Sequence, residues 1–92
     1  MSRSGAADWR EKLNEEVAAL RTLRDELRVR VHLGAMDARD RWEDAERAWH
    51  ELEGRLDDLG RATAESARDV GTAVRLLAST VRDAYGHVRA AL

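Results

Sequence analysis

Apolar residues recur along this chain at alternating steps of three and four, which is the period of an α-helix with one buried face. Three such series follow one another. They are Leu13, Val17, Leu20, Leu27 and Val31, then Trp42, Ala45, Trp49, Leu52, Leu56 and Leu59, and finally Ala67, Val70, Val74, Leu77, Val81, Ala84 and Val88. No stretch alternates with the period of two typical of a β-strand. The pattern predicts an all-α protein with coiled-coil-like seams.

Two glycines mark the places where helices could end. Gly34 follows the first series and Gly60 follows the second, and a glycine just past the last periodic residue commonly stops a helix. Successive seams differ in phase by four residues, which a continuous helix also absorbs by local unwinding. Gly60 is the stronger break, because Thr63 and Ser66 can cap a following helix and Ser66 with Asp69 approximates a capping box.

These breaks predict an elongated helical hairpin, with a long helix over about 7–59 and a second helix over about 63–91 that folds back on it. Residues 1–6 are expected to form a disordered tail and residues 7–92 a single domain. The shorter helix cannot cover the longer one, so apolar seam stays exposed until another copy covers it. A compact three-helix bundle with turns near Gly34 and Gly60 is the alternative, and an uninterrupted helix is the third arrangement.

Composition narrows the classes of function. The 92 residues include no proline and no cysteine, and 43% are hydrophobic and 37% charged. Without cysteine there is no disulfide, no thiolate metal site and no thiol nucleophile. So short a chain cannot enclose a deep substrate cleft and keep a core of its own. We therefore expect a non-enzymatic protein that uses no cofactor.

Charge excludes a further class of partner. Sixteen basic residues face eighteen acidic ones, a net charge of -2, so we expect no nucleic-acid partner. Residues 37–66 are acidic and residues 67–92 basic, so these segments would attract each other side by side. Pairs of acid and base four residues apart support helix: Asp8/Lys12, Glu26/Arg30, Asp37/Arg41, Glu43/Arg47, Glu51/Arg55 and Asp57/Arg61.

The location expected from the sequence is cytoplasmic. No apolar stretch of signal-peptide length follows Met1, and no run approaches the roughly 20 apolar residues that span a bilayer.

The seams supply the candidate assembly interface. We expect it to comprise Trp42, Trp49, Leu52, Leu56 and Leu59, with Val74, Leu77 and Val81 opposite. Tryptophans one heptad apart favour a cross-section of more than two helices, since narrow seams prefer Leu, Ile and Val. On this hypothesis the protein is a homo-oligomer or binds a protein partner, and Trp49→Glu dissociates the assembly.

A series of arginines suggests a second function. Arg61, Arg68, Arg75, Arg82 and Arg89 repeat every seven residues beside the third seam. They are candidates for pairing with a partner helix or for contact with an anionic lipid or granule surface through residues 63–92.

A metal-dependent enzyme is the third hypothesis. Its candidate ligands, His32, His50 and His87, lack metal-ligand spacing, although Glu46, His50 and Glu53 share one helix face.

Three segments carry a family resemblance. They are DELRVRVHLGAMDARDRWE (25–43), VGTAVRLL (70–77) and DAYG (83–86). The chain resembles small bacterial coiled-coil proteins, some of which are grouped as stress-response proteins. The resemblance implies a soluble bacterial helical protein, with no catalytic residue to carry over. It also favours an unbroken helix through Gly34.

Overall fold

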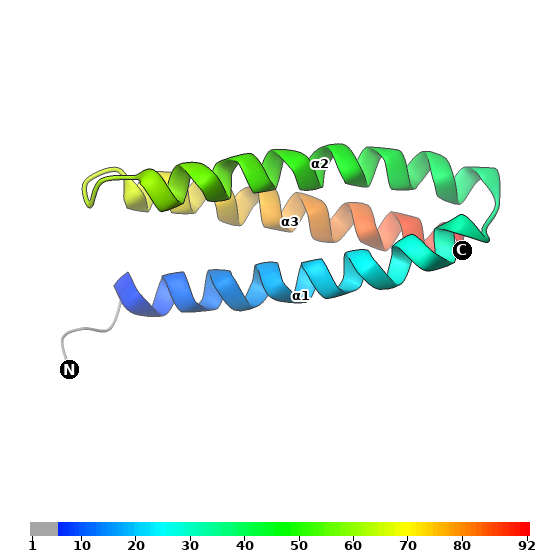
Figure 1. Cartoon of the computed structure of the whole chain (residues 1–92), viewed down its shortest axis with the longest axis horizontal. Helices are drawn as coiled ribbons and strands as arrows, with labels where there is room; N and C mark the ends of the chain where they lie inside the picture. Colours follow the sequence, from blue (N-terminus) through cyan, green and yellow to red (C-terminus); the bar gives the residue numbers. More distant parts are fainter. Residues whose placement is uncertain (1–5) are drawn as a thin grey trace.

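Three helices make up the part of the chain that the structure, a computed structural model, describes, which is residues 6–92 (Figure 1). They are α1 (Ala6–His32), α2 (Met36–Arg61) and α3 (Ala67–Ala91). The helices share one long axis and run alternately up and down, in a bundle of 50 × 23 × 15 Å. The all-α prediction is confirmed. Of the predicted tail, residues 1–5 lie outside the described residues and Ala6 already belongs to α1.

The long first helix predicted over residues 7–59 is wrong. The chain leaves helical geometry at residues 33–35 and reverses, as the three-helix alternative requires. A helix of that length would extend about 80 Å, whereas the longest dimension of the molecule is 50 Å. The physical reason for the reversal is burial, because it brings the apolar face of α1 onto α2 and α3 within one chain.

The first turn does not depend on a left-handed glycine. The Gly34 N–H donates to the Val31 carbonyl at 2.9 Å, and Ala35 is extended, with φ -73° and ψ 165°. Gly34 itself has no left-handed φ; a Cβ placed on it would lie 3.3 Å from Cδ2 of Leu92. The glycine thus allows a close approach of the end of α3. No side chain caps the start of α2.

The second turn lies slightly later than the glycine that predicted it. α2 continues through Gly60 to Arg61 and ends where Ala62 becomes extended, with φ -71° and ψ 146°. The hydroxyl of Thr63 accepts a hydrogen bond from the Ser66 N–H at 3.3 Å, so Thr63 closes the turn before α3, while Ser66 holds the N-cap position itself. Ser66 makes no side-chain cap bond, and the predicted capping box is therefore wrong.

The three predicted seams form one core. Every member of the first series is buried, and the rest of the core comes from α2 and α3, where Tyr85 is also fully buried although it flanks its seam. α2 and α3 lie closest together, which places the acidic segment beside the basic one as the charge pattern predicted.

Ion pairs along α2 use a different spacing from the predicted one. Arg47 pairs with Asp44, and both Arg55 and Arg61 pair with Asp58 at 3.4 Å, a spacing of three residues. Among the side chains that the structure describes, which exclude Asp8, none of the predicted pairs four residues apart forms an ion pair. The shorter spacing suits the short aspartate side chains.

Candidate functional site

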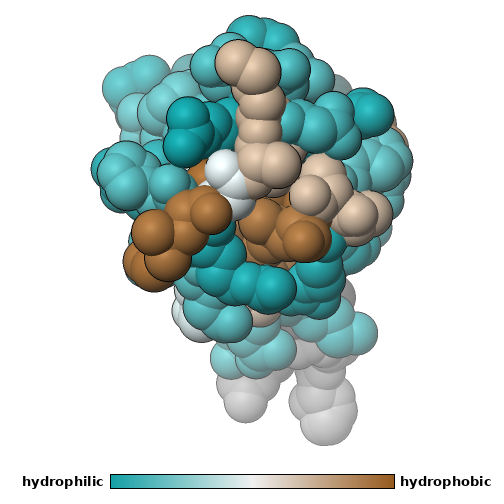
Figure 2. Space-filling view, turned by 90° about the vertical axis from the view of Figure 1, so that its right-hand side faces the viewer, coloured by the Kyte–Doolittle hydropathy of each residue, from teal (hydrophilic) through white to brown (hydrophobic). Residues whose placement is uncertain are grey.

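An apolar surface lies at the end of the bundle where the α1–α2 turn meets the end of α3. Leu33 is 86% exposed and Met36 is 77% exposed, and both Val29 and Leu92 are also exposed. Figure 2 looks onto this end and shows apolar side chains gathered inside a rim of hydrophilic ones. We call Val29, Leu33, Met36 and Leu92 the apolar end patch. Exposed apolar groups gathered in one place commonly mark an interaction site.

Charges of both signs flank the apolar end patch. The last turn of α1 carries Arg30 and His32, and the first turn of α2 carries Asp37. A groove of about 370 Å³ runs beside the patch between Arg28, Val29, His32 and Leu33. No prediction from the sequence singled out Leu33. The available signal was the presence of large apolar residues in a short connection, where polar residues are the norm.

The residues predicted as an assembly interface come together inside a single chain. Trp49, Leu52, Leu59, Val74 and Val81 are buried in the core, and Trp42, Leu56 and Leu77 are partly buried against it. The prediction that these residues form an interface between copies assumed that an apolar seam stays exposed. In the described residues α1 covers that seam. Trp49 is only 1% exposed, so Trp49→Glu would disrupt the fold of the chain itself.

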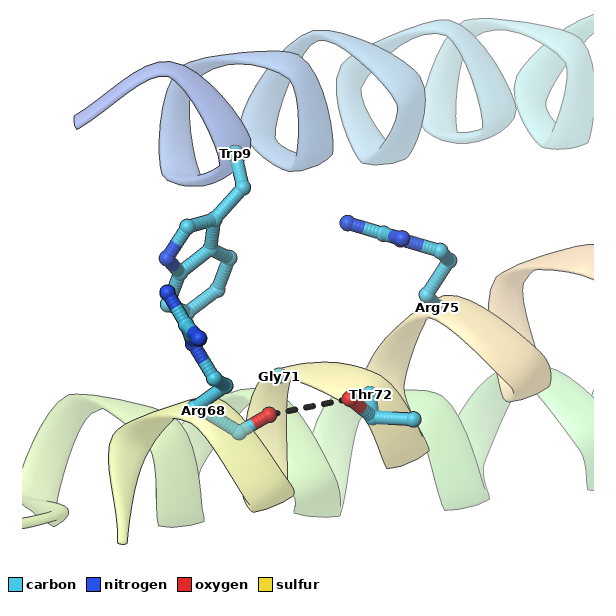
Figure 3. Close-up of a pocket in the computed structure, with 5 residues that line it drawn as sticks. All are labelled: Trp9, Arg68, Gly71, Thr72 and Arg75. Carbon is cyan, nitrogen blue, oxygen red and sulfur yellow. Dashed lines mark hydrogen bonds between the residues drawn. The ribbon is translucent and has the colours of Figure 1, made fainter. Parts of the chain in front are cut away.

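The arginine series is divided by its contacts. Arg61 pairs with Asp58 at 3.4 Å, and Arg82 pairs with Glu16 of α1 at 2.8 Å. Arg68 and Arg75 instead line a pocket beneath Trp9 of α1 (Figure 3). The five arginines therefore do not act as one uniform stripe.

The apolar face of α3 is turned toward the protein core. Val74, Val81 and Val88 are fully buried, so the face that would enter a lipid surface is covered by the other two helices. Within residues 6–92, no helix has the length and apolar character needed to cross a membrane.

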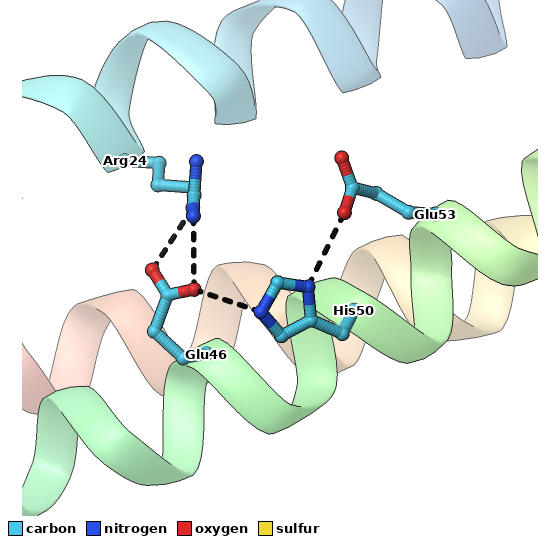
Figure 4. A network of polar contacts seen from close by, with 4 residues as sticks. All are labelled: Arg24, Glu46, His50 and Glu53. Carbon is cyan, nitrogen blue, oxygen red and sulfur yellow. Dashed lines mark hydrogen bonds and ion pairs between the residues drawn. The ribbon is translucent and has the colours of Figure 1, made fainter.

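A polar network joins α1 to α2 across the bundle (Figure 4). Nε and Nη2 of Arg24 each donate to a carboxylate oxygen of Glu46 at 2.9 Å. Nε2 of His50 lies 3.5 Å from Glu46, and Nδ1 of His50 lies 3.3 Å from Oε1 of Glu53. The hydrogen bond to Glu46 is the main reason that the pKa of Arg24 is raised above its ordinary value.

The same arginine explains an interruption in the first apolar series. The guanidinium groups of Arg24 and Arg21 lie 5.5 and 5.6 Å from the centre of the Trp49 ring. A cation over an indole face is favourable, so Arg24 covers the core tryptophan while its charge is matched by Glu46. We interpret this network as a clamp between helices. In the described part of the chain, no group of three or more His, Cys, Asp or Glu residues is placed to hold a metal ion.

Two buried polar atoms in the core have no hydrogen-bond partner. They are Nε1 of Trp49 and the hydroxyl of Tyr85. The Tyr85 ring stacks on Trp42 with centroids 6.1 Å apart and an interplanar angle of 17°. Burial, which disfavours the phenolate, raises the pKa of Tyr85 above its ordinary value.

Comparisons of the chain with protein-family models, with curated proteins and with solved structures find no match. The similarity to bacterial coiled-coil and stress-response proteins accordingly stays an expectation. The surfaces described above carry the functional argument.

Proposed function

We propose that this chain is a non-enzymatic protein that acts through protein–protein interaction, by pairing its apolar end patch with the same patch of a second copy. The observation that carries the proposal is the exposure of Leu33 and Met36 together at one end of the bundle. It favours an interface at the end of the bundle over one along the seams. The two bundles would meet end to end.

Burial of apolar surface supplies the driving force. Each square ångström of apolar surface removed from water contributes roughly 25 cal/mol. Leu33 lies in the α1–α2 turn and Met36 at the first position of α2. A second copy could thus cover them without any change in the core. A patch of four side chains is small for an interface, so we expect a dimer whose population depends on concentration.

Charge around the patch favours a second copy as the partner. The patch is flanked by basic Arg30 in the last turn of α1 and by acidic Asp37 in the first turn of α2. In a two-fold dimer each residue meets its counterpart reciprocally, so the acidic edge of one copy can face the basic edge of the other. A partner of a single charge sign would match only half of this rim.

The cytoplasmic location expected from the sequence and a role in stress belong to the same proposal. The role in stress rests on the resemblance to bacterial coiled-coil proteins. We expect the abundance of the protein in its native cells to rise after heat or oxidative stress. Quantitative mass spectrometry of stressed and unstressed cells measures this directly.

Sedimentation velocity over a concentration series tests the dimer. The wild-type chain should shift from the mass of one chain toward twice that mass as concentration rises. Leu33→Glu places like charges against each other in the dimer and should keep the chain monomeric. Leu76→Glu is the matched control, because Leu76 is 66% exposed on α3 but lies about 24 Å along the helix from Leu92.

Two outcomes would contradict the proposal. One is a wild-type chain that stays monomeric at all concentrations. The other is a dimer that Leu33→Glu and Leu76→Glu weaken equally, because the contact would then not be centred on the apolar end patch. Circular dichroism of each variant establishes that a change in mass does not reflect unfolding.

A further inference from the structure

We infer that the pocket between the first turns of α1 and α3 binds a phosphate group that is attached to an apolar or aromatic body. The pocket has a volume of about 290 Å³ and is lined by Trp9, Arg68, Gly71, Thr72 and Arg75 (Figure 3). It lies toward the end of the bundle opposite the apolar end patch. The inference is thus independent of the proposed dimer.

Two arginines give the pocket its charge. Arg68 and Arg75 stand two turns apart on α3, and neither forms an ion pair among the side chains that the structure describes. Arg61 and Arg82 of the same series do form ion pairs. An anion in the pocket would be attracted by both guanidinium groups. Phosphate suits this position because each guanidinium can donate two parallel hydrogen bonds to it.

The remaining polar group of the pocket is already engaged. The hydroxyl of Thr72 donates to the main-chain carbonyl of Arg68 at 3.0 Å, so its proton is not available to an anion. Recognition of the phosphate therefore falls on Arg68 and Arg75. A variant at either position should show it.

The indole of Trp9 forms the apolar wall of the pocket. It extends from α1 toward Gly71 of α3, and a Cβ at position 71 would contact Cζ3 of the indole and lie 2.7 Å from Cη2. The glycine thus allows the ring to approach α3 closely. The Arg10 guanidinium also lies over this ring, 5.1 Å from the ring centroid. A flat aromatic wall beside two guanidinium groups favours a ligand with an apolar body next to its phosphate.

NMR titration of the full ¹⁵N-labelled chain at low salt tests the inference, with inorganic phosphate and phenyl phosphate as separate probes. Both should give saturable shifts of the Trp9 indole N–H and of amides within residues 68–75, with phenyl phosphate binding more tightly. Arg68→Gln and Arg75→Gln should each weaken binding roughly tenfold, a typical effect of removing one charged contact. Arg89→Gln, on the same helix and in the same series, is the matched control and should leave affinity unchanged.

A second variant separates the roles of the indole and of the arginines. Gly71→Ala displaces Trp9 and keeps both guanidinium groups, so it should abolish the preference for phenyl phosphate over inorganic phosphate. If that preference survives in Gly71→Ala, the indole is not part of the site. The inference is overturned if neither probe causes a shift and the chain does not bind phosphatidylglycerol vesicles. It is also overturned if Arg75→Gln and Arg89→Gln weaken phosphate binding equally.

The phosphate could also belong to a lipid headgroup, and vesicle flotation distinguishes this source. The phosphate belongs to a lipid if neither soluble probe binds and the chain binds phosphatidylglycerol vesicles but not phosphatidylcholine vesicles. That binding should be lost in Arg75→Gln and kept in Arg89→Gln. Saturable binding of phenyl phosphate assigns it to a small molecule.

Discussion

At the scale of single residues, the core contains a tyrosine hydroxyl with no hydrogen-bond partner, at Tyr85. A buried polar group without a partner costs about 1–3 kcal/mol. Tyr85→Phe removes that group and keeps the ring that stacks on Trp42. We therefore expect Tyr85→Phe to raise the free energy of unfolding at neutral pH by about 1 kcal/mol, as measured by urea denaturation.

The same residue predicts how stability changes in alkali. In the unfolded chain a tyrosine loses its proton near its ordinary pKa of 10.0, whereas burial raises the pKa of Tyr85 in the folded chain. Above pH 10 the folded state therefore holds more protons than the unfolded state, and stability falls as pH rises. Below that pH this contribution is fully present. Tyr85→Phe should make the decline less steep; equal slopes in the two proteins would show that Tyr85 does not cause it.

At the scale of helices and turns, the two connections differ in how their ends are satisfied. Thr63 caps the turn that leads into α3, whereas α2 begins after Ala35, which cannot cap although its backbone is already extended. Ala35→Ser should therefore supply the missing cap and stabilise the protein by about 1 kcal/mol. Thr63→Ala is the complementary variant and should cost about the same. Thermal denaturation measures the stability of both variants. If Ala35→Ser leaves the stability unchanged, a hydroxyl at this position does not reach the N–H groups at the start of α2.

The sequence predicted the helices better than their connections. Spacing alone located the buried faces, because a helix with one apolar face has few other ways to bury Leu27 or Val81. It could not decide the path of the chain at Gly34, where a phase shift of four residues fits either a turn or a continuous helix. Burial of the apolar face of α1 on α2 and α3 decides it, and no local pattern contains those contacts. Leu92, which lies close to Gly34, is 58 residues further along the chain.

The functional surfaces were harder to predict for a related reason. Trp49 and its neighbours have the character of an interface, but their burial depends on whether α1 folds back over them. The pocket at Gly71 depends on the approach of Trp9, which is distant in sequence. Arg24 stands between Leu20 and Leu27 of the first apolar series, and its charge is accommodated there by Glu46 and the Trp49 ring. Residue type predicted chemistry in each case, whereas tertiary contacts determined which side chains remained accessible.

At the scale of the whole molecule, the three helices are not equally well held. α2 and α3 lie closer to each other than either does to α1. Besides its apolar face, α1 is held by the Arg24–Glu46 pair, with side chains only 20% exposed, and by Arg82–Glu16. Regions with fewer buried contacts open at lower free energy than the whole protein. We therefore expect hydrogen exchange to be fastest in α1, with α2 and α3 opening only on global unfolding.

Glu46→Gln tests which contacts set that order, because it weakens the partly buried clamp between α1 and α2 and leaves α3 untouched. Exchange measured by mass spectrometry should accelerate in α1 by roughly tenfold, with a smaller change in α3. Glu53→Gln is the matched control, since Glu53 pairs with the exposed His50 on its own helix. Uniform protection across the three helices would contradict the order. If α1 does open first, the Trp49 seam becomes accessible only in that open state, so assembly along the seam would compete with the docking of α1.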